Sequence, residues 1–88
     1  MKVGMCGSME SNDCIITIKE NDGNNNTIAI NSIVDDFFHS QIEDVIKSVL
    51  EEKNINGVIV ECNDKGALDF TIRARTITAL ERYKESVK

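Results

Sequence analysis

The sequence has no proline, no tryptophan and only one histidine, His39. It also has no Gly-x-Ser-x-Gly segment, so no serine is predicted to be activated as a nucleophile by a neighbouring base. No apolar run approaches the roughly 20 residues that span a bilayer. No long apolar segment follows Lys2 either, and we therefore predict neither a membrane span nor a signal peptide.

The three cysteines, Cys6, Cys14 and Cys62, include no Cys-x-x-Cys pair. An odd number of widely spaced cysteines is typical of reduced thiols in a cytoplasmic protein and predicts no metal framework. The stretch 22–33 begins with the spacing of a calcium loop, but it lacks the glycine and the glutamate that such a loop needs. We therefore expect no metal and a cytoplasmic location.

A chain of 88 residues is long enough for one domain with a modest core. Its composition, 41% hydrophobic and 28% charged, is that of a folded globular protein. The net charge of −5 arises in residues 1–64, whereas residues 65–88 are basic. An acidic body argues against nucleic-acid binding, which requires a basic surface.

Alternation of apolar residues predicts strands at 14–19, 27–30 and 58–62. Helical periodicity predicts helices at 33–53, in one or two pieces, and at about 66–83. The order β-β-α-β-α favours an α+β domain with two layers, in which two helices cover a three-stranded sheet. We expect the first two strands to form an antiparallel hairpin, with the first strand at the centre of the sheet.

The expected helix boundaries come from capping patterns. Ser40-Gln41-Ile42-Glu43 matches a capping box and predicts a helix start near residue 41. Asn63 or Asp64 is the expected N-cap of the second helix. The first helix has one apolar stripe, formed by Ile42, Val45, Ile46, Val49 and Leu50. The expected buried side of the second helix comprises Ala67, Phe70, Ala74, Ile77 and Leu80.

Residues 1–13 are predicted to be a flexible N-terminal segment that precedes a single domain at 14–88. Within that segment, residues 7–13 are small, polar and acidic, which predicts an exposed loop. Ser11 lies at its centre, where an enzyme can reach it. A serine in such a loop is usually a turn residue. Our interpretation is that Ser11 carries a covalently attached cofactor, which another protein installs.

Several segments together resemble the acyl carrier protein, or gamma subunit, of citrate lyase. They are Glu-Ser at 10–11, Ile-Asn-Ser at 30–32, Gly-Val at 57–58, Asp-Lys-Gly-Ala-Leu-Asp at 64–69 and Arg-Ala-Arg at 73–75. The likeness covers nearly the whole chain. One departure is Asn12, where the family usually has glycine; asparagine is the next most tolerant of a positive φ.

The resemblance implies that Ser11 bears a phosphoribosyl-dephospho-coenzyme A group through a phosphodiester bond. A dedicated transferase installs this group, and its terminal thiol is acetylated. The alpha subunit exchanges the acetyl group for citrate and releases acetate. The beta subunit cleaves the citryl thioester to oxaloacetate and regenerates the acetyl thioester. On this reading the chain catalyses nothing itself and carries the thioester between two active sites.

Two alternatives stay open on the sequence. The first is the carrier of a related enzyme, citramalate lyase or malonate decarboxylase, and the second is an unmodified α+β interaction domain. We also expect an ion pair between Arg73 and Asp69 within the second helix. Arg75 has no such partner within the helix, which favours a contact with a partner subunit or with cofactor phosphates.

Four further residues bear on the cofactor. Lys65 and Gly66 open the second predicted helix, where backbone N–H groups can also receive phosphate. Glu10 and Asp13 flank Ser11, and we hypothesise that their negative charge keeps an anionic arm off the domain surface.

Overall fold

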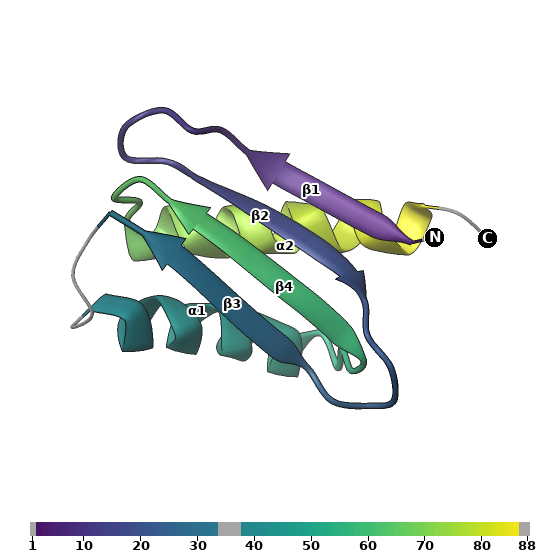
Figure 1. Cartoon of the computed structure of the whole chain (residues 1–88). Helices are drawn as coiled ribbons and strands as arrows, with labels where there is room; N and C mark the ends of the chain where they lie inside the picture. Colours follow the sequence, from purple (N-terminus) through teal and green to yellow (C-terminus); the bar gives the residue numbers. More distant parts are fainter. Residues whose placement is uncertain (1, 34–37, 87–88) are drawn as a thin grey trace.

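The computed structural model describes residues 2–33 and 38–86. It contains four strands and two helices in the order β-β-β-α-β-α (Figure 1). Their bounds are β1 (Val3–Gly7), β2 (Cys14–Glu20), β3 (Thr27–Ser32), α1 (His39–Glu52), β4 (Val58–Asp64) and α2 (Asp69–Glu85).

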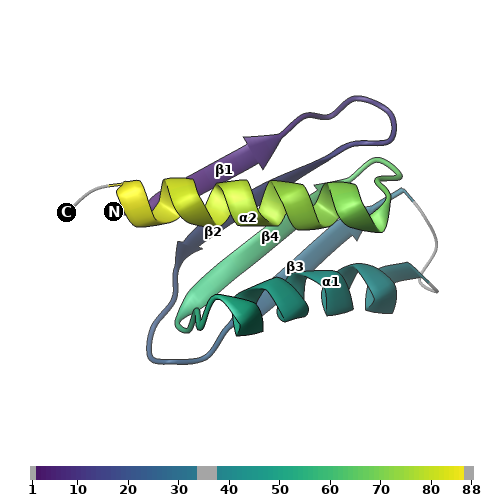
Figure 2. The ribbon, with the colours of Figure 1, turned by 180° about the vertical axis from the view of Figure 1, so that it is seen from behind.

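The strands form one mixed sheet in the order β1-β2-β4-β3. β2 is antiparallel to both β1 and β4, whereas β3 and β4 are parallel and are connected through α1. Figure 2 shows that α1 and α2 cover the same face of the sheet. The two-layer α+β class is therefore confirmed, but the strand order differs: of the three predicted strands, β4 rather than β2 lies between the other two. The predicted three-stranded sheet is wrong, because β1 adds a fourth strand.

The predicted hairpin between 14–19 and 27–30 is also wrong. β4 lies between these two strands and pairs with both of them, so β2 and β3 are not neighbours. The loop between β2 and β3 instead crosses the end of the sheet, where the Asn26 side chain bonds to the backbone of Ile55 and Val58.

β1 lies within the segment that the sequence predicted to precede the domain. Gly4 and Cys6 face the helices, whereas Val3 and Met5 are exposed. A side chain at Gly4 would collide with the backbone of α2, at Ala79 and Tyr83. Glycine at this position therefore allows α2 to lie directly on β1.

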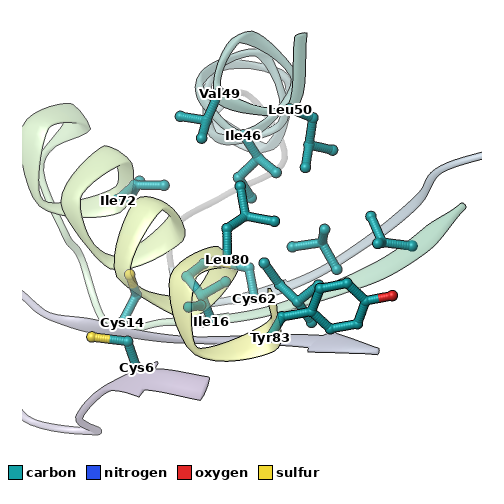
Figure 3. Close-up of a cluster of buried hydrophobic side chains, with 14 of the residues drawn as sticks. Cys6, Cys14, Ile16, Ile46, Val49, Leu50, Cys62, Ile72, Leu80 and Tyr83 are labelled. Carbon is teal, nitrogen blue, oxygen red and sulfur yellow. The ribbon is translucent and has the colours of Figure 1, made fainter. Parts of the chain in front are cut away.

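One apolar core lies between the sheet and the helices (Figure 3). Its α2 contribution is Ile72, Thr76, Ala79, Leu80 and Tyr83. Of the side predicted from the sequence, Leu80 is buried and Ala67 and Ile77 are partly buried, but Phe70 and Ala74 are exposed. Apolar residues occur on several sides of α2, so periodicity alone does not identify the side that packs on the sheet.

α1 buries Ile42, Ile46, Val49 and Leu50, which confirms most of its predicted stripe. The predicted capping box does not form, because Phe38 is the N-cap residue and makes no side-chain capping bond. The part of the first predicted helix at 34–37 lies outside the described residues. α2 starts at Asp69 after an N-cap at Leu68, rather than after Asn63 or Asp64.

Candidate functional site

Ser11 is exposed on the loop that connects β1 to β2, at the end of the molecule where β4 runs into α2 (Figure 1). It is the second residue of a turn in which the Asp13 N–H donates to the Glu10 carbonyl oxygen over 3.2 Å. Asn12, the third residue, has φ of 66°. Type II turns require a positive φ at this position, which explains why a glycine or an asparagine stands after the serine.

The Ser11 turn is bonded to the β4–α2 turn through the backbone. The Asn12 N–H donates to the Lys65 carbonyl oxygen (2.8 Å), and the Lys65 N–H donates to the Asp13 carbonyl oxygen (2.9 Å). These two bonds link segments that are more than fifty positions apart in the sequence. The Glu-Ser segment and the Asp-Lys-Gly segment are thus neighbours in space.

Asp64 shapes the β4–α2 turn from inside, because its side chain is buried to all but 3%. Its carboxylate accepts hydrogen bonds from the Ser32 hydroxyl (2.7 Å), the Gly66 N–H (3.1 Å) and the Ala67 N–H (2.8 Å). Gly66 has φ of 91°, a conformation that side chains disfavour. The carboxylate therefore fixes the backbone against which the Ser11 turn rests.

Asp13 and Arg75 fasten the other side of the Ser11 turn. Arg75 binds the Asp13 carboxylate with two nitrogens, at 2.9 and 2.8 Å, and the Ser8 hydroxyl donates to it at 2.7 Å. The Arg75 and Ser8 hydrogen bonds hold the pKa of Asp13 well below its usual range, and the bond to Asp13 raises the pKa of Arg75. Bidentate pairs of this kind are geometrically specific.

This pair bears on two sequence expectations. Arg75 has an acidic partner 62 positions away, so the lack of a partner within its own helix no longer points to a subunit or a phosphate. The charge of Asp13 is matched by Arg75, which leaves only Glu10 of the two flanking acids to act by repulsion. Spacing within one helix could not predict the Asp13–Arg75 pair, and the hydrogen bond from Ser8 to Asp13 was not predicted either.

The expected pair between Arg73 and Asp69 does not form. Arg73 instead binds Glu52 of α1 through two nitrogens, at 2.9 and 2.6 Å, and the guanidinium lowers the pKa of Glu52. Asp69 accepts a hydrogen bond of 3.2 Å from Gln41. Both contacts join α1 to α2. They therefore fix the distance between α1 and α2, the helix that carries Arg75.

Within residues 2–33 and 38–86, the reactive side chains do not form a catalytic arrangement. No hydrogen bond of these residues involves the Ser11 hydroxyl, and no group of their side chains has the make-up of a metal site. All three cysteines are buried, and hydrogen bonding to Cys14 and burial raise the pKa of the Cys62 thiol. No helix among the described residues is long and apolar enough to cross a membrane.

The fold and the site define a small α+β domain, of the kind expected for a carrier, that holds one serine outward on a turn fixed by hydrogen bonds. A family described as malonate decarboxylase delta subunit (an acyl carrier protein family) matches residues 1–83. Among curated relatives, the citrate lyase acyl carrier protein of Streptococcus uberis is 45% identical over 93% of this chain and 80% of the relative. The protein of the same name from Halothermothrix orenii is 40% identical over 99% of this chain and 92% of its own length.

The same protein from Streptococcus equi subsp. equi is 41% identical over 92% of this chain and 79% of the relative. A solved chain in a Pseudomonas malonate decarboxylase hetero-tetramer has the same fold, with a TM-score of 0.78 at 14% identity over 93% of this chain and 84% of that chain. The chain belongs to the citrate lyase acyl carrier protein family.

Proposed function

We propose that the chain is the acyl carrier subunit of a cytoplasmic citrate lyase and that Ser11 is the attachment site of a phosphoribosyl-dephospho-coenzyme A arm. The observation that carries the proposal is the position of Ser11. Its hydroxyl is exposed, whereas its turn is held by the segments that resemble the family, at 64–69 and 73–75. The arm supplies a terminal thiol that carries an acyl group as a thioester.

The residues around Ser11 fit an attached phosphodiester. The Ser11 side chain has no hydrogen bond to give up within the described part of the chain, and Arg75 matches the charge of Asp13. The backbone of Lys65 is hydrogen-bonded to the Ser11 turn through Asn12 and Asp13. The chain's own task is to present the anchor in a fixed place, so that a tethered acyl group reaches its partners at high effective concentration.

On this proposal the chain performs no bond chemistry. The prosthetic-group transferase loads Ser11, and the alpha and beta subunits of the lyase act on the acyl group. Within residues 2–33 and 38–86, no base is hydrogen-bonded to the Ser11 hydroxyl, which supports a non-catalytic role. The likeness to a malonate decarboxylase chain supports a carrier of that enzyme as the second candidate.

Intact mass of the protein from its native source tests the attachment. We expect a cofactor-sized adduct on the peptide that contains Ser11, absent in Ser11→Ala. Ser8→Ala is the matched control, because Ser8 lies in the same loop but bonds to Asp13; it should still be loaded. An unmodified mass in an active complex would support the interaction-domain alternative. Release of oxaloacetate from citrate, against decarboxylation of malonate, then separates the two carriers.

A further inference from the structure

Asn56 and Gly57 form the single Asn-Gly dipeptide of the sequence, in the turn between α1 and β4. This turn lies at the opposite end of β4 from the Ser11 loop (Figure 1). Asn56 is exposed, and it lines two open hollows on the surface. Water therefore has access to the Asn56 side chain.

The two reacting groups of this dipeptide are both free within residues 2–33 and 38–86. The Asn56 side-chain amide makes no hydrogen bond there, and the Gly57 N–H donates to no acceptor. Most backbone N–H groups of a folded chain are paired, so an unpaired one stands out. Gly57 also has no side chain that could shield its nitrogen. The Gly57 nitrogen is thus available to attack the side chain that precedes it.

Asn54, in the same turn, provides a contrast. The residue that follows it, Ile55, is β-branched and crowds its own backbone nitrogen. The Ile55 N–H also donates to the Leu50 carbonyl oxygen over 2.9 Å. The fold therefore holds back the nitrogen after Asn54, but it leaves the nitrogen after Asn56 free.

We propose that Asn56 is a site of spontaneous covalent modification, at which its amide is converted to aspartate or isoaspartate. The Gly57 nitrogen attacks the Cγ atom of Asn56, a C–N bond forms and the bond from Cγ to its NH2 group breaks. Ammonia leaves and takes up the proton of the Gly57 nitrogen, which gives a cyclic imide. Water then adds to one of the two imide carbonyl carbons, whose bond to the ring nitrogen breaks. Opening at the side-chain carbonyl gives aspartate, and opening at the main-chain carbonyl gives isoaspartate.

The hydrogen bonds of Asn26 make the two products unequal for the fold. The Asn26 side chain donates to the Ile55 carbonyl oxygen (2.9 Å) and accepts from the Val58 N–H (3.1 Å), so it bridges the residues on either side of the dipeptide. Isoaspartate lengthens the main chain between these two points by one atom, whereas aspartate leaves its length unchanged. We therefore expect isoaspartate to strain the Asn26 bridge and aspartate to leave it in place.

The test is incubation of the full chain at mildly alkaline pH and body temperature, followed by digestion with trypsin, which releases residues 54–65 as one peptide. We expect a gain of one mass unit at Asn56 and none at Asn54, which is the internal control. The product should separate into two chromatographic forms, of which an isoaspartyl methyltransferase labels one. Asn56→Asp is the matched control for charge, and the isoaspartate form should unfold at a lower urea midpoint than this variant.

An Asn56 amide that stays intact in the folded chain, while the urea-unfolded chain converts it, overturns the inference. Equal conversion at Asn54 also overturns it, as does an undiminished methyl label in Asn56→Ser. An isoaspartate form with the urea midpoint of Asn56→Asp overturns the role given to Asn26. These outcomes do not involve Ser11, so the adduct at Ser11 tests the proposed function separately.

Discussion

Replacement of the buried Asp64 carboxylate should loosen the support of the Ser11 turn. In Asp64→Asn, one carboxylate oxygen becomes an NH2 group that cannot accept a hydrogen bond. The Ser32 hydroxyl can reverse its bond to this group, but the N–H of Gly66 or of Ala67 cannot, whichever way the amide is turned. At least one backbone donor therefore loses its acceptor.

The expected loss of stability follows from that count. A hydrogen bond to a charged group is worth about 1.5–3 kcal/mol, so Asp64→Asn should lower the free energy of unfolding by about 2 kcal/mol. For a domain of this size, about 1 kcal/mol shifts Tm by roughly 4–8 °C, so a decrease of about 8–16 °C is expected. Asp64→Ala removes all the acceptors and should be more destabilising still.

Urea unfolding followed by circular dichroism measures the change in unfolding free energy. Asp69→Asn is the control, because Asp69 is exposed and, among the described residues, accepts a side-chain hydrogen bond from Gln41 alone; it should stay within about 0.5 kcal/mol of wild type. Hydrogen exchange of the Asn12 and Lys65 amides should accelerate in Asp64→Asn before global unfolding. If Asp64→Asn unfolds with the same midpoint as Asp69→Asn, the carboxylate does not hold the turn.

Two more changes test the turn itself. The pKa of Asp13 in the folded chain lies below its ordinary value of 3.8, so the stabilisation that its carboxylate contributes is present above about pH 4 and is lost as the pH falls further. Asp13→Asn should therefore lower the urea midpoint at pH 7 and weaken the decline of that midpoint on acidification. An unchanged pH profile would contradict the role given to Arg75. Asn12→Ala should destabilise the chain by about 1–2 kcal/mol, because residue 12 has a positive φ, whereas Asn12→Gly should not. Equal urea midpoints for the two variants would count against the turn geometry.

The elements with strong local patterns could be predicted from the sequence. β2, β4 and the apolar stripe of α1 have clear periodicity, and the β-α-β connection through α1 followed from their order. β1 has only five residues, and two of them are glycines, so its pattern is weak. Its place depends on pairing with β2 and on close contact with α2, and neither is visible in a local window.

The candidate site, too, was predictable from the sequence only in part. The exposure of Ser11 was predictable because its loop has no apolar period. The partners of Asp13, Arg75 and Asp64 come from other elements, so spacing along one helix pointed Arg73 to the wrong acid. Phe70 is apolar at a helical position yet exposed, because the side of α2 that packs on the sheet is set by tertiary contacts and not by the helical period alone.

The hydrogen bonds that hold the Ser11 turn also have a consequence for biosynthesis. The serine is translated early, but Asp64, Lys65 and Arg75, which shape its turn, follow it by more than fifty residues. A nascent chain that ends before α2 exposes the hydroxyl without the geometry that surrounds it in the finished domain. Any modifying enzyme that recognises that geometry, rather than the short peptide, therefore acts only on completed and folded molecules.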